Sequence, residues 1–116
     1  MTNRAINKSI AEFLGWKELD FHLDGKRILG DRPTFSNGKI ISYTVDQYVP
    51  DYCNDLNAIQ EVVNTLKDPI QQSYYVYYLG DWSTFEKGEY ATFGIVNSTA
   101  KERAKAFLKT IGKWKE

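Results

Sequence analysis

Residues 49–62 read VPDYCNDLNAIQEV and place a cluster of polar residues directly before a helical pattern. The pattern predicts an amphipathic helix over residues 54–66. Asn54 or Asp51 can accept hydrogen bonds from the first free N–H groups of such a helix. Its apolar side recurs every three or four residues, at Leu56, Ile59, Val63 and Leu66.

A helix cap does not use every polar residue of this stretch. Tyr52, Asn57 and the second aspartate are left over, and the N-terminus of a helix also attracts anions. Two interpretations therefore stay open: the cluster starts a helix, or it is part of a binding site.

Two further helices are predicted. Residues 3–14 place their apolar side chains on one helical face, and Gly15 is a suitable terminator. Near the other end, Thr99 and Glu102 have the spacing of a capping box, which predicts a helix over residues 99–111.

Two β-branched and aromatic runs, 39–45 and 91–96, predict strands between these helices. A short hairpin is compatible with residues 18–29, and residues 31–39 are interpreted as a loop. This order of elements predicts an α+β fold, an α-β-α sandwich in which helices cover a small, mainly antiparallel sheet. The whole chain, 1–116, is expected to form one domain.

The segment 73–79, SYYVYYL, fits two structures. Its aromatic content favours a strand, which would place tyrosine rings on both faces, but a helix can also run on from Pro69. The chain has 3 Trp, 8 Tyr and 6 Phe, more large rings than a domain of 116 residues easily buries. We therefore expect a homo-oligomer in which some of these rings are covered.

Charge and cysteine content narrow the function classes. Fifteen basic and fifteen acidic residues give zero net charge, which argues against extended nucleic acid as a partner. No apolar run has the length of a signal peptide or a membrane span, so no membrane association is expected. Cys53 is the only cysteine, which predicts a reducing, cytoplasmic location.

The sequence offers little catalytic chemistry. His22 is the only histidine, and with Cys53 it does not make up a metal-ligand set. No glycine-rich phosphate loop and no spacing typical of a nucleophile and base is present. We therefore expect a protein that is not an enzyme and uses no cofactor and no metal.

The last twenty residues are basic. Residues 97–116 carry six cations and two acids, and Lys101, Lys105 and Lys109 step by four along one helical face. A solvated face explains this pattern, but so does an edge that faces an anion. A small phosphorylated ligand needs only two or three cations and an aromatic ring on which to stack.

These patterns predict a site for a small anionic, nucleotide-like ligand. Arg103 is the first choice for a two-pronged phosphate contact because its guanidinium is planar. In the competing interpretation Arg103 pairs with Asp51 or Asp55 and ties two helices together. The predicted ligand-binding residues are Arg103, Lys105, Lys109, Tyr78, Trp82, Asn54 and Asp55.

Two segments, 50–66 and 98–108, resemble the phage and prophage proteins that carry the phage ABA sandwich domain. The first agrees with that pattern at Pro50, Tyr52, Asp55, Ala58, Glu61, Val62, Val63 and Leu66. The second agrees at Ala100, Arg103, Ala104 and Leu108. The resemblance implies an α-β-α layered sandwich and a phage or prophage origin.

The chain also resembles small phage counter-defence sponges, among them the Thoeris anti-defence sponges, in size and in its aromatic and cationic content. This similarity implies a protein that sequesters a small, cyclic or otherwise phosphorylated nucleotide that serves as a bacterial immune signal. There are two alternatives. The protein can be an inhibitor that binds a host defence protein, or it can be a hydrolase of the signal nucleotide.

Overall fold

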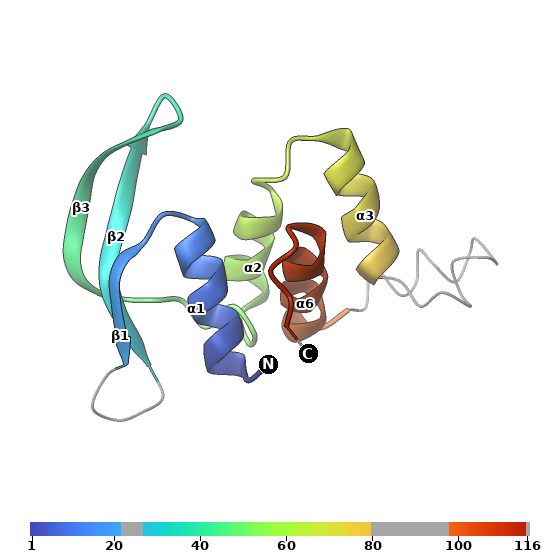
Figure 1. Cartoon of the computed structure of the whole chain (residues 1–116), viewed down its shortest axis with the longest axis horizontal. Helices are drawn as coiled ribbons and strands as arrows, with labels where there is room; N and C mark the ends of the chain where they lie inside the picture. The colour runs from blue at the N-terminus through green and yellow to red at the C-terminus, as the bar shows by residue number, and fades with distance from the viewer. Residues whose placement is uncertain (22–26, 80–97, 116) are drawn as a thin grey trace. The chain divides into compact units, whose positions relative to one another are not determined.

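The computed structural model describes residues 1–21, 27–79 and 98–115, and it divides the chain into two units (Figure 1). The N-terminal unit comprises Thr2–Pro50. The C-terminal unit comprises Asp51–Glu116 together with Met1. The predicted strand over 91–96 lies outside the described residues.

The N-terminal unit begins with helix α1, Asn3–Phe13, which confirms the helix predicted over 3–14. The hydroxyl oxygen of Thr2 accepts a hydrogen bond from the backbone N–H of Ala5 and caps the helix. Gly15 follows with φ of +95°, a left-handed conformation that glycine adopts without strain, so the chain turns sharply into the sheet.

Three antiparallel strands follow: β1 (Lys17–Phe21), β2 (Ile28–Ser36) and β3 (Lys39–Tyr48), in the order β1-β2-β3. The strand predicted over 39–45 is confirmed. Asn37 and Gly38 both have positive φ, so the β2–β3 hairpin closes through a tight turn of a type common between twisted strands.

The loop predicted over 31–39 is wrong, because β2 continues through Pro33 to Ser36. Proline has no N–H to donate and is therefore excluded from strands paired on both sides. Here the pairing of β1 with β2 reaches only as far as Asp31, so Pro33 pairs with Tyr43 of β3 alone. The predicted turn chemistry at residues 36–38 is in the right place.

Strand β3 carries two irregularities in its pairing with β2. The pairing shifts once around Ile41 and again around Val45 and Asp46. At each shift β3 has one residue more than β2. Asp46 has φ of 55°, as expected where a bulge turns the backbone. Ile41 and Val45, at the two bulges, are 64% and 62% exposed.

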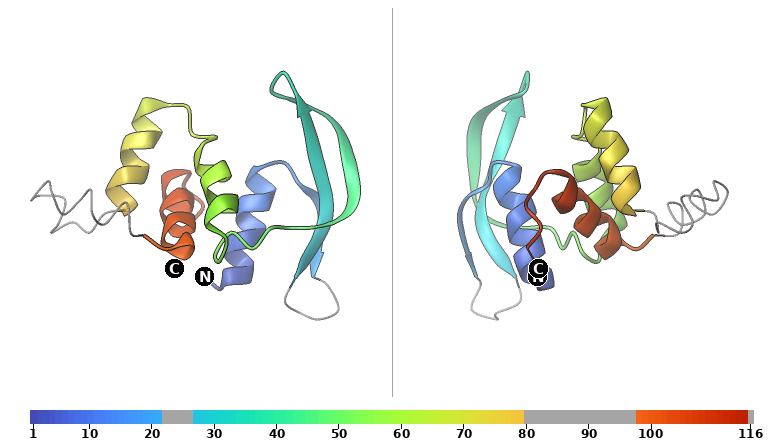
Figure 2. Two further views of the ribbon diagram at one scale, coloured as in Figure 1. Left: turned by 180° about the vertical axis from the view of Figure 1, so that it is seen from behind. Right: turned by 45° about the vertical axis from the view of Figure 1, so that its right-hand side comes forward.

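The C-terminal unit contains three described helices: α2 (Leu56–Val63), α3 (Pro69–Leu79) and α6 (Ala100–Thr110). Helix α6 packs against both α2 and α3 (Figure 2). Its side chains Phe107, Leu108 and Ala104 are fully buried, and they form the centre of this unit.

Helix α2 is shorter than the predicted 54–66. It starts at Leu56 because the side chain of Asp55, rather than that of Asn54 or Asp51, accepts the hydrogen bond from the backbone N–H of Ala58. It ends at Val63, and the next residues continue as turns.

Segment 73–79 is helical, as part of α3, so the expectation that its tyrosines occupy both faces of a strand is wrong. Pro69 occupies the first turn, where its missing N–H costs nothing, and the carboxylate of Asp68 accepts a hydrogen bond from the backbone N–H of Ile70. This N-terminal signal favours a helix, and it outweighs the β propensity of the tyrosines.

The predicted capping box is confirmed in both directions. The backbone N–H of Glu102 donates to the Thr99 hydroxyl, and the backbone N–H of Thr99 donates to the Glu102 carboxylate, at 3.1 Å each.

The α+β class with a small antiparallel sheet and helices is likewise confirmed. Within the described residues no helix is long and apolar enough to cross a membrane.

Candidate functional site

The polar cluster before α2 is engaged in its own hydrogen bonds. Asp55 caps the helix, and the amide nitrogen of Asn54 donates to the Asp51 carboxylate at 2.9 Å. The intervening side chains of Tyr52 and Cys53 are buried. These contacts support the interpretation of the stretch as a helix start, because the side chains of Asn54 and Asp55 already take part in hydrogen bonds within the protein.

Arg103 ties two helices together. Its Nη1 donates to the Oε1 atom of Gln60 at 2.9 Å, which links α6 to α2. The competing interpretation named Asp51 or Asp55 as its partner, whereas this hydrogen bond joins Arg103 to a neutral amide. The same guanidinium acts on Tyr75 of α3: burial raises the pKa of this tyrosine, and the positive charge of Arg103 opposes the rise.

One predicted pair of site residues comes together in the structure. Lys109 Nζ lies over the ring of Tyr78, 5.7 Å from its centre. The Tyr78 ring is stacked with Tyr74 at a centroid distance of 6.4 Å and meets Tyr77 edge-on at 5.4 Å. All three tyrosines are exposed. We refer to Tyr74, Tyr77, Tyr78 and Lys109 as the tyrosine–lysine surface.

Sequence analysis did not single out Tyr74 and Tyr77 as site residues. Once the segment is a helix, the spacing of four between Tyr74 and Tyr78 places the two rings side by side. That spacing was the available signal, and the uncertainty between helix and strand concealed it.

Lys105 contacts a different aromatic residue from the one that Lys109 contacts. Its Nζ lies 5.1 Å from the ring centre of Trp114, beyond the end of α6. Trp114 was not predicted as a site residue, and Trp82, which was, lies outside the described residues. Lys105 and Lys109 are one turn apart on α6, and each of them lies over a different aromatic ring.

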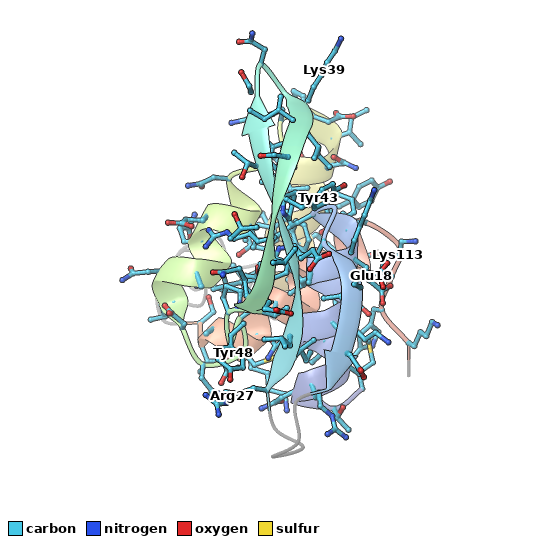
Figure 3. All side chains as sticks on the ribbon, turned by 90° about the vertical axis from the view of Figure 1, so that its left-hand side faces the viewer. Glu18, Arg27, Lys39, Tyr43, Tyr48 and Lys113 are labelled. Atoms are coloured by element: carbon cyan, nitrogen blue, oxygen red, sulfur yellow. The ribbon has the colours of Figure 1, made fainter. Side chains whose placement is uncertain are left out.

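The sheet has cation–aromatic pairs of its own, which the sequence patterns did not indicate. Arg27 lies over the ring of Tyr48 at 4.4 Å (Figure 3). Lys17 lies over the ring of Tyr43 at 4.6 Å. Each pair brings together residues from different parts of the sheet, so neighbouring sequence gave no signal. In each pair the cation lies over the face of the tyrosine ring, where the electron density of the ring attracts it.

An open pocket of about 470 Å³ lies between the end of α2 and the middle of α3. It is distinct in composition from the tyrosine–lysine surface. Its lining residues are Val63, Asn64, Leu66, Lys67, Gln72, Tyr75 and Val76. The side-chain nitrogen of Gln72 donates to the backbone oxygen of Leu66 at 2.8 Å, which fixes one wall.

Among the described residues no group of three or more His, Cys, Asp or Glu side chains is placed to hold a metal ion. Within the described part of the chain, the candidate site features are the tyrosine–lysine surface, the Lys105–Trp114 pair and the pocket beside α2. A comparison of the chain with protein-family models, curated proteins and solved structures finds no match.

Proposed function

We propose that this chain is a non-enzymatic binding protein whose tyrosine–lysine surface takes a small anionic, nucleotide-like ligand. The observation that carries the proposal is the position of Lys109 over Tyr78, within a group of three exposed tyrosine rings. Phenol rings offer faces for a base, and an ammonium beside them offers a charge for a phosphate.

The energetics of such a site are adequate for binding. Stacking of a base on an aromatic side chain contributes roughly 1–3 kcal/mol. A lysine at the rim adds a point charge that needs no fixed geometry. Exposed tyrosine rings also cost little side-chain entropy when a ligand covers them, because they have only two rotatable bonds.

The cellular part of the proposal follows from the resemblance to phage ABA sandwich proteins and to counter-defence sponges. In this role the protein, in the cytoplasm of a bacterial host, sequesters a cyclic or phosphorylated nucleotide that serves as an immune signal. Assembly into a homo-oligomer would place several such surfaces on one particle and raise the capacity for the ligand.

A second candidate function is inhibition of a host protein by direct binding. It is favoured by large apolar side chains that are more than half exposed: Ile41 and Val45 in β3, and Ile70 in α3. Such side chains are typical anchors of protein–protein interfaces. The two candidates can be distinguished by what raises the melting temperature of this chain: a nucleotide in the first case and a host protein in the second.

The test is a thermal-shift screen of the purified chain against linear and cyclic nucleotides, followed by isothermal titration. A ligand at one hundred times its Kd stabilises the folded state by about 2.7 kcal/mol. The nucleotide recovered after denaturation should be chemically intact, which distinguishes a sponge from a hydrolase.

Variants assign the binding to the surface. Tyr78→Leu and Lys109→Met should each weaken nucleotide binding about tenfold or more, since each removes a contact of roughly 1.4 kcal/mol. Tyr48→Leu, in the N-terminal unit, and Lys101→Met, two turns before Lys109 on α6, are the matched controls, and they should leave affinity unchanged. Equal effects of the site and control variants, or no nucleotide that stabilises the wild type, would contradict the proposal.

A further inference from the structure

A chain of hydrogen bonds ends at the pocket between α2 and α3, and its direction follows from the groups that it joins. The chain starts at Arg103, whose Nη1 donates to Gln60 Oε1 at 2.9 Å. Gln60 Nε2 then donates to Asn64 Oδ1 at 3.0 Å. Asn64 is the last member, and it lines the pocket.

The direction follows from the chemistry of arginine. A guanidinium has donors only, so the oxygen of Gln60 must face Arg103. The Gln60 nitrogen is then turned toward Asn64, whose oxygen must accept. The amide nitrogen of Asn64, with its two N–H donors, takes no part in this chain, and Asn64 is one of the residues that line the pocket.

The other polar groups of the lining extend this donor character. Lys67 provides the one charge among the lining residues, and no carboxylate is among them. The pKa of Tyr75 is raised by burial, so its hydroxyl stays protonated at neutral pH and remains able to donate. Gln72 also lines the pocket, and its side-chain nitrogen donates to the backbone oxygen of Leu66. The remaining lining residues are apolar: Val63, Leu66 and Val76.

The composition sets the charge and shape of a fitting ligand. A single cation with two neutral donors balances a singly charged acceptor group, whereas a phosphate dianion would bring an uncompensated charge. The aliphatic walls need an aliphatic body. A volume of about 470 Å³ is within the range of small-molecule sites in proteins.

We propose that this pocket binds a small aliphatic monocarboxylate, with the carboxylate held by Lys67 and the amide N–H groups of Asn64 and the chain lying against Val63, Leu66 and Val76. This site is separate from the tyrosine–lysine surface and takes a different class of ligand. It does not depend on nucleotide binding.

The probe is hexanoate, with hexanamide as its uncharged counterpart of nearly equal shape. In two-dimensional NMR of the isotope-labelled full chain, hexanoate should shift the side-chain amide signals of Asn64 and the backbone signals around Lys67. Hexanamide should bind about tenfold more weakly, because it lacks the charge. Equal affinity for the two, no shift with either, or shifts on the tyrosine–lysine surface alone would overturn the proposal.

Asn64→Asp is the sharpest variant. It is nearly isosteric and keeps an oxygen for Gln60, but it replaces the amide N–H donors with a negative charge facing the ligand. Hexanoate affinity should fall at least tenfold, while the matched control Asn57→Asp, on the exposed side of α2, should bind as the wild type does. Unchanged affinity in Asn64→Asp would contradict the proposed geometry.

Lys67→Met provides a second variant that does not touch the hydrogen-bond chain. Lys67 is exposed, so the substitution should leave the melting temperature nearly unchanged and lower hexanoate affinity about tenfold. Lys101→Met on α6 controls for the general loss of one positive charge. If Lys67→Met and Lys101→Met bind hexanoate equally well, the proposed role of Lys67 is wrong.

Discussion

Gln60 is a neutral, half-buried residue whose importance comes from its two neighbours. It accepts from Arg103 and donates to Asn64, so one amide joins α6 to the C-terminal end of α2. Hydrogen bonds to charged groups stabilise a fold more than neutral ones do. At this position the amide holds a guanidinium in place between two helices.

Replacing Gln60 with Leu should therefore lower the free energy of unfolding by about 1–2 kcal/mol, because Arg103 loses an acceptor in a half-buried position. Urea denaturation followed by circular dichroism measures the loss. Glu61→Leu, at the neighbouring exposed position on the same helix, is the control and should change stability by less than about 0.5 kcal/mol. An equally small effect of Gln60→Leu would mean that solvent replaces the bond.

Asp55 has a simpler role as the cap of α2. Asp55→Ala should cost about 1 kcal/mol of stability, since the backbone N–H of Ala58 loses its acceptor. Asn57→Ala, two residues further along the chain and exposed, should have no comparable cost. A loss of nucleotide affinity in Asp55→Ala without any loss of stability would instead restore this residue as part of a binding site.

Cys53 makes stability depend on pH in the alkaline range. Burial, and then the charge of Asp51, raise the pKa of this thiol from 9.0 to about 11. The unfolded chain thus releases the thiol proton at a lower pH than the folded chain does. Its contribution to stability is complete below about pH 9 and is lost as the pH rises towards 11.

Melting temperatures measured from pH 8 to pH 11 should fall more steeply for the wild type than for Cys53→Ala, which lacks the titrating thiol. The protected thiol should also react with iodoacetamide at neutral pH only after denaturation. Parallel pH profiles for the two proteins would show that Cys53 titrates alike in both states.

At the scale of elements, helix α6 could be predicted because its signals are local: a capping box at one end and a glycine after the other. Strand β2 could not, because the tolerance of Pro33 depends on where a neighbouring strand stops. Helix α3 could be recognised only by weighing its start at Pro69 against the β propensity of its tyrosines. The contact between Gln60 and Arg103 joins residues far apart in the chain, and no local pattern encodes it.

Helix α6 packs against two helices, so its small residues set how closely they approach. Ala104 is fully buried. Ala104→Leu should lower the free energy of unfolding by about 1–3 kcal/mol, since added methylene groups in a packed core force side chains or helices to move. Lys101→Leu, one turn earlier and exposed, is the control for helix propensity and added apolar volume. Chemical denaturation compares the two variants, and equal stabilities would indicate space beside Ala104.

For the whole molecule the remaining prediction is self-association. The expectation rests on the number of large rings in the sequence. Large side chains are left exposed in both units, including Ile41, Val45 and Ile70. Light scattering at micromolar concentration should give a dimer mass or more. Ile41→Lys with Val45→Lys tests the sheet, and Ile70→Lys tests α3; the variant that lowers the mass identifies the interface. A monomer mass for the wild type would contradict the prediction.

The bulges of β3 have a consequence for the chain at high concentration. Residues 39–45 have the composition of fibril-forming peptides, with β-branched and aromatic side chains, no proline and a single charge. The shifts at Ile41 and at Val45–Asp46 bend the strand, so that a strand from another molecule meets no continuous ladder along it. Deleting Ile41 would straighten the first shift, and amyloid that stains with thioflavin should then form sooner from this deletion variant than from the natural chain.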